Sequence, residues 1–124
     1  MDISETYMKM NEKAEEIQPE YLNYADYYIW PSGNWYIWSD DNQSKRTKET
    51  IWLPRQDQLQ EMFPKDRIER PFYWFSEGMI DSFGDYGITN EGLYYEGFST
   101  WEQLWLAFVM KEKYNKVWDG EKWI

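Results

Sequence analysis

Apolar residues recur at helical spacing along the N-terminal segment and indicate an amphipathic α-helix. Asp2, with Glu5 three positions later, predicts the N-cap and its capping partner. Pro19 predicts the end of the helix, because proline cannot continue the hydrogen-bond ladder. The apolar stripe consists of Ile3, Tyr7, Met10, Ala14 and Ile17.

The pattern changes to that of a β-hairpin at "YYIWPSGNWYIW", residues 27–38. Residues that favour strands flank a Pro-Ser-Gly-Asn turn signal. With Ser32 and Gly33 at the tip, Trp30 would lie opposite Trp35. One face would then carry Tyr28, Trp30, Trp35 and Ile37, and the other would carry Tyr27, Ile29, Tyr36 and Trp38. Since neither face is polar, we expect one to pack on helices and the other to pack or to serve as a contact surface.

The rest of the chain alternates between polar connections and apolar segments. Residues 40–50 are polar and predict a loop, while residues 51–53 predict a short strand followed by a helix that begins near Pro54. Residues 72–83 favour a helix, and residues 86–96 favour a second hairpin with a glycine in its loop.

The most apolar helix is predicted close to the C-terminus, where Ser99 and Glu102 match a capping box. Its stripe consists of Trp101, Leu104, Trp105 and Phe108, and further apolar residues widen it, so this helix should be buried. A turn is predicted at Asp119-Gly120.

These elements predict an α+β fold, with three to four helices packed on a small antiparallel sheet. The 124 residues suit one domain, and no internal repeat or linker divides them, so residues 1–124 are predicted to form a single domain.

Composition narrows the available chemistry. The chain has no cysteine and no histidine, which removes disulfides, thiolate zinc sites, and every nucleophile paired with histidine. Asp81 and Asp85 suggest a calcium loop, but Phe83 and Gly92 stand where that loop requires ligands. We therefore expect no catalytic residue, no metal and no cofactor, and we do not expect an enzyme.

The net charge of −10 is unevenly distributed. Residues 1–26 carry seven acids and two bases, and residues 71–102 carry six acids and no base. Such a chain should be repelled by nucleic acid and by anionic membranes, and attracted to proteins with basic surfaces. We also expect neither a signal peptide nor a membrane span, because the N-terminus is charged and no long apolar run occurs.

Two segments, "IWLPRQDQLQEMF" (51–63) and "STWEQLWLAFVMKEKYNKVWDGEKWI" (99–124), resemble small uncharacterised proteins of phages and prophages of Gram-positive bacteria. The resemblance covers about a third of the chain and brings no known activity. It implies a viral or prophage origin and no more. The charged N-terminus and the lack of a long apolar run predict a soluble protein in the cytoplasm of the host cell.

Three functions fit this sequence. The first is an acidic protein that binds and inhibits or redirects a host protein, such as a nucleic-acid enzyme of a defence system, by presenting carboxylates in place of phosphates. The second is a module that binds carbohydrate or a small ligand on an aromatic platform, and the third is a structural or accessory phage protein. The candidate partner-binding residues are Glu12, Glu15, Glu16, Glu20, Trp35, Trp38, Asp40, Asp41, Glu77, Asp81, Asp85, Glu91 and Glu96.

Overall fold

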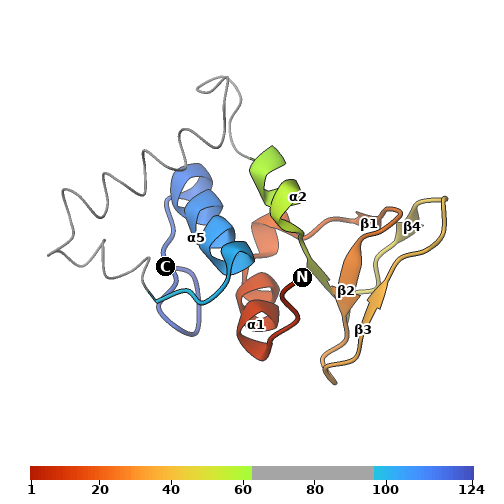
Figure 1. Cartoon of the computed structure of the whole chain (residues 1–124), viewed down its shortest axis with the longest axis horizontal. Helices are drawn as coiled ribbons and strands as arrows, with labels where there is room; N and C mark the ends of the chain where they lie inside the picture. The colour runs from red at the N-terminus through yellow and green to blue at the C-terminus, as the bar shows by residue number, and fades with distance from the viewer. Residues whose placement is uncertain (63–96) are drawn as a thin grey trace, which may run out of the picture. The chain divides into compact units, whose positions relative to one another are not determined.

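The computed structural model describes residues 1–62 and 97–124. Contacts divide the chain into two compact units: the first comprises Met1–Arg55 and Val117–Ile124, and the second comprises Gln56–Lys116. The described part has mixed helix and strand content, with three α-helices and two small antiparallel sheets (Figure 1). The α+β class is therefore confirmed in this coarse form. The helix predicted over 72–83 and the second hairpin over 86–96 lie outside the described residues.

In the first unit, helix α1 (Glu5–Lys13) begins later than the sequence predicts. Its N-cap is Ser4, whose hydroxyl accepts a hydrogen bond from the backbone N–H of Tyr7, whereas Asp2 accepts one from the N–H of Ser4. The prediction of Asp2 as the N-cap is thus wrong by two residues. Ile3, which precedes the helix, is 40 % exposed and does not join the core. The remainder of the predicted stripe is buried, and α1 packs against strand β5 (Ile51–Leu53).

Helix α1 ends at Lys13, well before Pro19, and a short 3-10 helix follows at Glu15–Ile17. The indole N–H of Trp123 donates a buried hydrogen bond of 2.9 Å to the carbonyl of Met10. Met10 lies in the last turn, where the carbonyls have no α-helical partner. A donor from the other end of the chain therefore stabilises this terminus, which local sequence could not reveal.

Trp123 belongs to a C-terminal hairpin in which Val117 and Ile124 exchange two backbone hydrogen bonds of 2.9 Å. The rings of Trp118 and Trp123 pair across it, with centroids 5.1 Å apart. The predicted turn at Asp119-Gly120 is confirmed, and Gly120 has φ of 104°. The Asp119 carboxylate accepts backbone hydrogen bonds from residues 121 and 122, and these bonds lower the pKa of Asp119.

The main sheet has the strand order β3-β2-β5, in which β2 (Tyr27–Ile29) pairs with β3 (Trp35–Ile37) on one side and with β5 on the other. The predicted hairpin and the predicted strand at 51–53 are confirmed. A second sheet pairs β1 (Tyr21–Leu22) with β4 (Ser44–Lys45), so the prediction of a structureless loop over 40–50 is wrong at β4. This short pairing depends on a contact distant in sequence, which the polar composition of the loop does not indicate.

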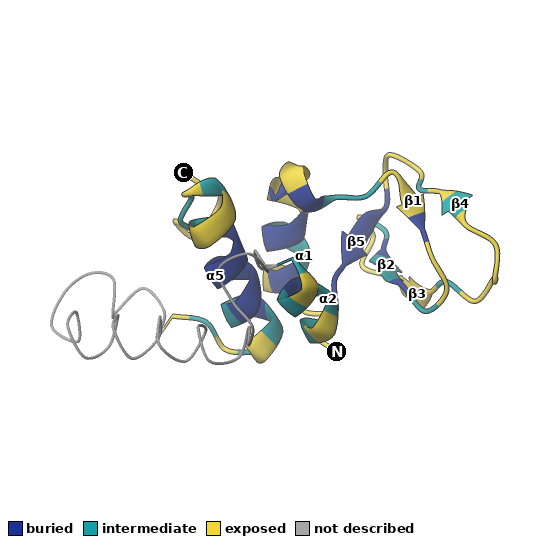
Figure 2. Ribbon diagram, turned by 90° about the horizontal axis from the view of Figure 1, so that it is seen from above, coloured by how far each residue is buried: buried dark blue, intermediate teal, exposed yellow. Residues whose placement is uncertain are grey.

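The second unit contains α2 (Gln56–Glu61) and α5 (Trp101–Tyr114), which contact each other. The N-cap of α5 is Thr100, one residue after the predicted Ser99, and its hydroxyl accepts a hydrogen bond from the N–H of Gln103. Residues 105–110 are buried without interruption, as expected for a helix that is apolar on most sides (Figure 2). Trp101, however, is 58 % exposed and does not belong to the buried stripe.

Candidate protein-binding surface

The loop of the β2–β3 hairpin sets the register of the strands and therefore decides which side chains share a face. Gly33 N–H donates to the carbonyl of Trp30 at 2.8 Å, and Trp30 N–H donates to the carbonyl of Asn34 at 2.9 Å. Pro31 lies at the second position of this turn, where its fixed φ is favoured, and Gly33 has φ of 96°. The loop thus has three residues and ends in a left-handed glycine, a common hairpin geometry.

The loop has three residues where a two-residue tip was predicted, so the predicted register is wrong by one residue. Ile29 lies opposite Trp35, Tyr28 opposite Tyr36, and Tyr27 opposite Ile37. Because side chains alternate along a strand, a slip of one residue changes the set that shares each face. One face carries Tyr27, Ile29, Trp35 and Ile37, and the other carries Tyr28, Tyr36 and Trp38.

Ring contacts agree with these two faces. Tyr27 and Trp35 stack with centroids 6.0 Å apart, and Tyr28 stacks on Tyr36 at 5.7 Å. Trp38 lies 6.4 Å from Tyr28, on the same face as Tyr36. Trp35 and Trp38 therefore lie on opposite faces, as in the predicted hairpin, and do not form one flat platform.

Strand β3 is exposed along its whole length, whereas β5 is buried along its whole length (Figure 2). The exposed fractions are 42 % for Trp35, 49 % for Tyr36 and 45 % for Ile37. Three consecutive large apolar side chains at such exposure are unusual on a folded surface. We call these three residues of the edge strand, with Trp35 and Ile37 on one face and Tyr36 on the other, the β3 patch. Tyr36 and Ile37 were not among the predicted site residues, because their exposure depends on the edge position of β3, which no sequence pattern specified.

Carboxylates adjoin the β3 patch. Asp40 and Asp41 follow the strand and are exposed, and Asp40 accepts a hydrogen bond from the N–H of Asn42 at 2.9 Å. The Trp38 indole donates to the carbonyl of Asn42 at 3.2 Å, which links this turn to the hairpin. No lysine or arginine occurs between Ala14 and Ser44, so the hairpin segment is purely acidic.

The predicted acidic face of the first helix does not form a purely anionic surface. Glu12, Glu15, Glu16 and Glu20 are all exposed. Glu12 and Glu15, however, line an open hollow of about 390 Å³ together with Arg46 and Lys48. The remaining predicted acids, Glu77, Asp81, Asp85, Glu91 and Glu96, lie outside the described residues.

The cluster of three bases at Lys45, Arg46 and Lys48 includes an arginine with a structural role. The Arg46 guanidinium donates to the carbonyls of Pro19, Thr47 and Thr50. Its backbone N–H also donates to the carbonyl of Glu20 at 2.9 Å. Arg46 therefore connects the β4 segment to the end of the N-terminal helical region.

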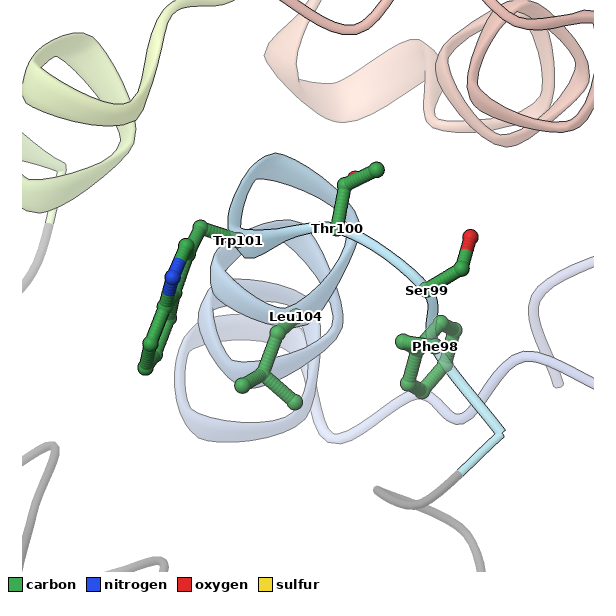
Figure 3. A pocket seen from close by; sticks show the side chains of 5 residues that line it. All are labelled: Phe98, Ser99, Thr100, Trp101 and Leu104. Carbon is green, nitrogen blue, oxygen red and sulfur yellow. The ribbon is translucent and has the colours of Figure 1, made fainter.

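A smaller hollow of about 200 Å³ lies at the N-terminus of α5. Its lining includes the exposed indole of Trp101, together with Leu104 and Phe98 (Figure 3). The lining has no charged side chain, and it offers only the hydroxyls of Ser99 and Thr100 as polar side-chain groups.

In the described ranges 1–62 and 97–124, no three acidic side chains are grouped so that they could hold a metal ion. None of the helices in those ranges combines the length and the apolar character that crossing a bilayer requires. Comparison of the chain with protein-family models, with curated proteins and with solved structures finds no match. The phage or prophage resemblance of residues 51–63 and 99–124 stays a prediction.

Proposed function

We propose that this chain is a protein-binding domain that engages a partner with a basic surface through the β3 patch. The observation that carries this proposal is the exposure of Trp35, Tyr36 and Ile37 in a protein that buries Trp52, Trp105 and Trp123. Tryptophan and tyrosine are the residues most enriched among those that dominate binding energy at protein interfaces.

The charge of the chain supports the choice of partner. Asp40 and Asp41 lie at the end of β3, and the net charge is −10. A positive partner would be drawn to this region before contact, and the apolar patch would then supply affinity. Nucleic acid and anionic membranes would be repelled. We further propose that the chain acts by binding and without catalysis, as a phage or prophage protein that inhibits or redirects a protein of its host cell.

The test is affinity capture from lysate of a Gram-positive host, followed by purification of the captured protein and measurement of its Kd. Replacement of Trp35 and Tyr36 by serine should weaken binding at least roughly 30-fold, as expected when the pair together contributes about 2 kcal/mol or more. The matched control replaces Tyr21 and Tyr24, exposed aromatics outside the patch, and should leave Kd nearly unchanged.

Salt and charge variants test the electrostatic part. Raising the salt concentration to about 0.5 M should slow association, because it screens charges that are not in direct contact. Replacement of Asp40 and Asp41 by asparagine should lower the association rate more than it raises the dissociation rate. A captured protein with an acidic surface, or equal affinity for the patch variant and its control, would refute the proposal.

A lectin-like role has weaker support. A sugar platform built from the predicted residues Trp35 and Trp38 would require both rings on one surface, but they lie on opposite faces of the hairpin. We therefore do not propose that the chain binds carbohydrate or a small ligand on an aromatic platform.

A further inference from the structure

The register of the hairpin fixes the direction of the backbone polar groups of β3. In an antiparallel pair, alternate residues direct their N–H and C=O toward the neighbouring strand. The backbone N–H of Trp30 donates to the carbonyl of Asn34, and the backbone N–H of Trp38 donates to the carbonyl of Asp26 at 2.8 Å. Tyr36 lies midway between Asn34 and Trp38, so its backbone N–H and C=O point toward β2. Trp35 and Ile37 direct their N–H and C=O away from the sheet.

The two edge strands of the sheet, β5 and β3, differ in whether their outward backbone groups are hydrogen-bonded. On the β5 edge, the side-chain amide of Gln18 accepts from the N–H of Trp52 at 2.9 Å and donates to its carbonyl at 3.1 Å. One side chain thus satisfies the outward backbone groups of β5. On the β3 edge, no residue of the described ranges makes a hydrogen bond to the outward groups of Trp35 or Ile37. Among the residues that the structure describes, one edge of the sheet is thus closed and the other is open.

An open edge with exposed apolar side chains is a template for another strand. We propose that β3 accepts an extended segment of its partner protein as a fourth strand, hydrogen-bonded to Trp35 and Ile37. This inference rests on the proposed function and specifies how the β3 patch is used. The occupant is a segment in which lysine or arginine alternates with apolar residues.

The surroundings of the edge select this occupant. Added side chains would alternate between the face of Trp35 and Ile37, which is apolar, and the face of Tyr36. A cationic side chain on the latter face would lie near a tyrosine ring. The Trp38 indole on the same face bonds to Asn42, the neighbour in sequence of the acids Asp40 and Asp41, and both rings and carboxylates favour a positive charge. A second copy of the chain fits less well, because its net charge is also −10.

Ile37→Pro tests the proposal directly. Proline removes an N–H that faces away from β2, so the ladder inside the sheet stays intact, and proline is tolerated at such edge positions. Ile37→Thr is the matched control, since it also removes the isoleucine side chain but keeps the N–H. Circular dichroism should show both variants folded.

The probe is a short peptide of alternating lysine and valine residues, titrated by fluorescence anisotropy. We expect wild type and Ile37→Thr to bind it, and Ile37→Pro to bind at least tenfold more weakly. The same peptide methylated on every backbone nitrogen keeps its charge and side chains, and it should not bind the wild-type protein. This second arm holds even if Ile37→Pro fails to fold.

Each alternative outcome has a distinct meaning. Equal binding by Ile37→Pro and Ile37→Thr, equal binding of the methylated peptide, or no binding of the peptide to wild type would overturn the added strand. A wild-type dimer that Ile37→Pro dissociates would show that a second copy occupies the edge, and would also overturn it. If the Trp35 and Tyr36 variant loses its captured partner while Ile37→Pro retains it, the binding patch stands and only the strand pairing fails.

Discussion

Trp123 is expected to stabilise the first unit through a specific hydrogen bond as well as through its buried ring. Its side chain is 8 % exposed, and its indole N–H donates to the Met10 carbonyl at 2.9 Å. Trp123→Phe keeps most of the ring and the contact with Trp118 but deletes the donor. The expected loss is about 1–3 kcal/mol, the cost of removing the partner of a buried polar group. Trp123→Ala removes the ring as well and should cost about 3–5 kcal/mol.

The assay is urea-induced unfolding followed by far-UV circular dichroism, because tryptophan fluorescence changes with the substitution itself. Trp35→Phe is the control: it is the same substitution at an exposed position, and it should change the free energy of unfolding by less than about 0.5 kcal/mol. If Trp123→Phe were no more destabilising than Trp35→Phe, the indole would not stabilise the end of α1, and the explanation for its early termination would be wrong.

Three further predictions concern residues of the first unit. Gln18→Ala removes both hydrogen bonds to the backbone of Trp52 and should lower the free energy of unfolding by about 1–3 kcal/mol in urea titrations, whereas an unchanged midpoint would show that the edge of β5 needs no closure. Ala25 has φ of 69°, so Ala25→Gly should raise the free energy of unfolding by up to about 1 kcal/mol, and a loss of stability would contradict strain at this residue. The Asp119 pKa is lowered by backbone hydrogen bonds, so the carboxylate stabilises the folded state above its unfolded pKa, and this contribution is lost as pH falls through the lowered folded pKa. The stability difference between wild type and Asp119→Asn in thermal melts should therefore shrink on acidification, and a difference independent of pH would rule out this linkage.

Local patterns were sufficient to predict several elements in both units. The hairpin, the strand at 51–53, the turn at Asp119-Gly120 and the buried C-terminal helix follow from periodicity and turn chemistry that act over a few residues. The mixed α and β content follows from those elements.

Details that depend on contacts between distant segments could not be predicted in the same way. The end of α1 depends on Trp123, and the pairing of β1 with β4 brings Tyr21 to Lys45. The hairpin register depends on whether the loop has an even or an odd number of residues. Loops of two or four residues give the predicted register and a loop of three gives the observed one, and the sequence Pro-Ser-Gly-Asn is compatible with each. One residue of difference changed both faces of the hairpin.

The residues of the candidate site also differ in whether local sequence or distant contacts determine them. Exposed Trp35 and the acids Asp40 and Asp41 were among the predicted residues, because aromatic and acidic side chains are conspicuous in the sequence. Arg46 and Lys48 follow Glu12 and Glu15 by more than thirty positions, so the sequence did not show that these acids and bases line the same hollow. The surface therefore carries both charges, and the predicted purely acidic face does not form.

Amide hydrogen exchange at Trp35 and Ile37 tests the central claim most directly, because it reports on the outward N–H groups themselves. We predict fast exchange of both amides in the free protein, and strong protection of both, with little change at Tyr36, when the partner segment or the lysine-valine peptide is bound. Slow exchange of Trp35 and Ile37 in the free protein, or exchange that stays fast in the complex, would contradict an open β3 edge that receives a partner strand.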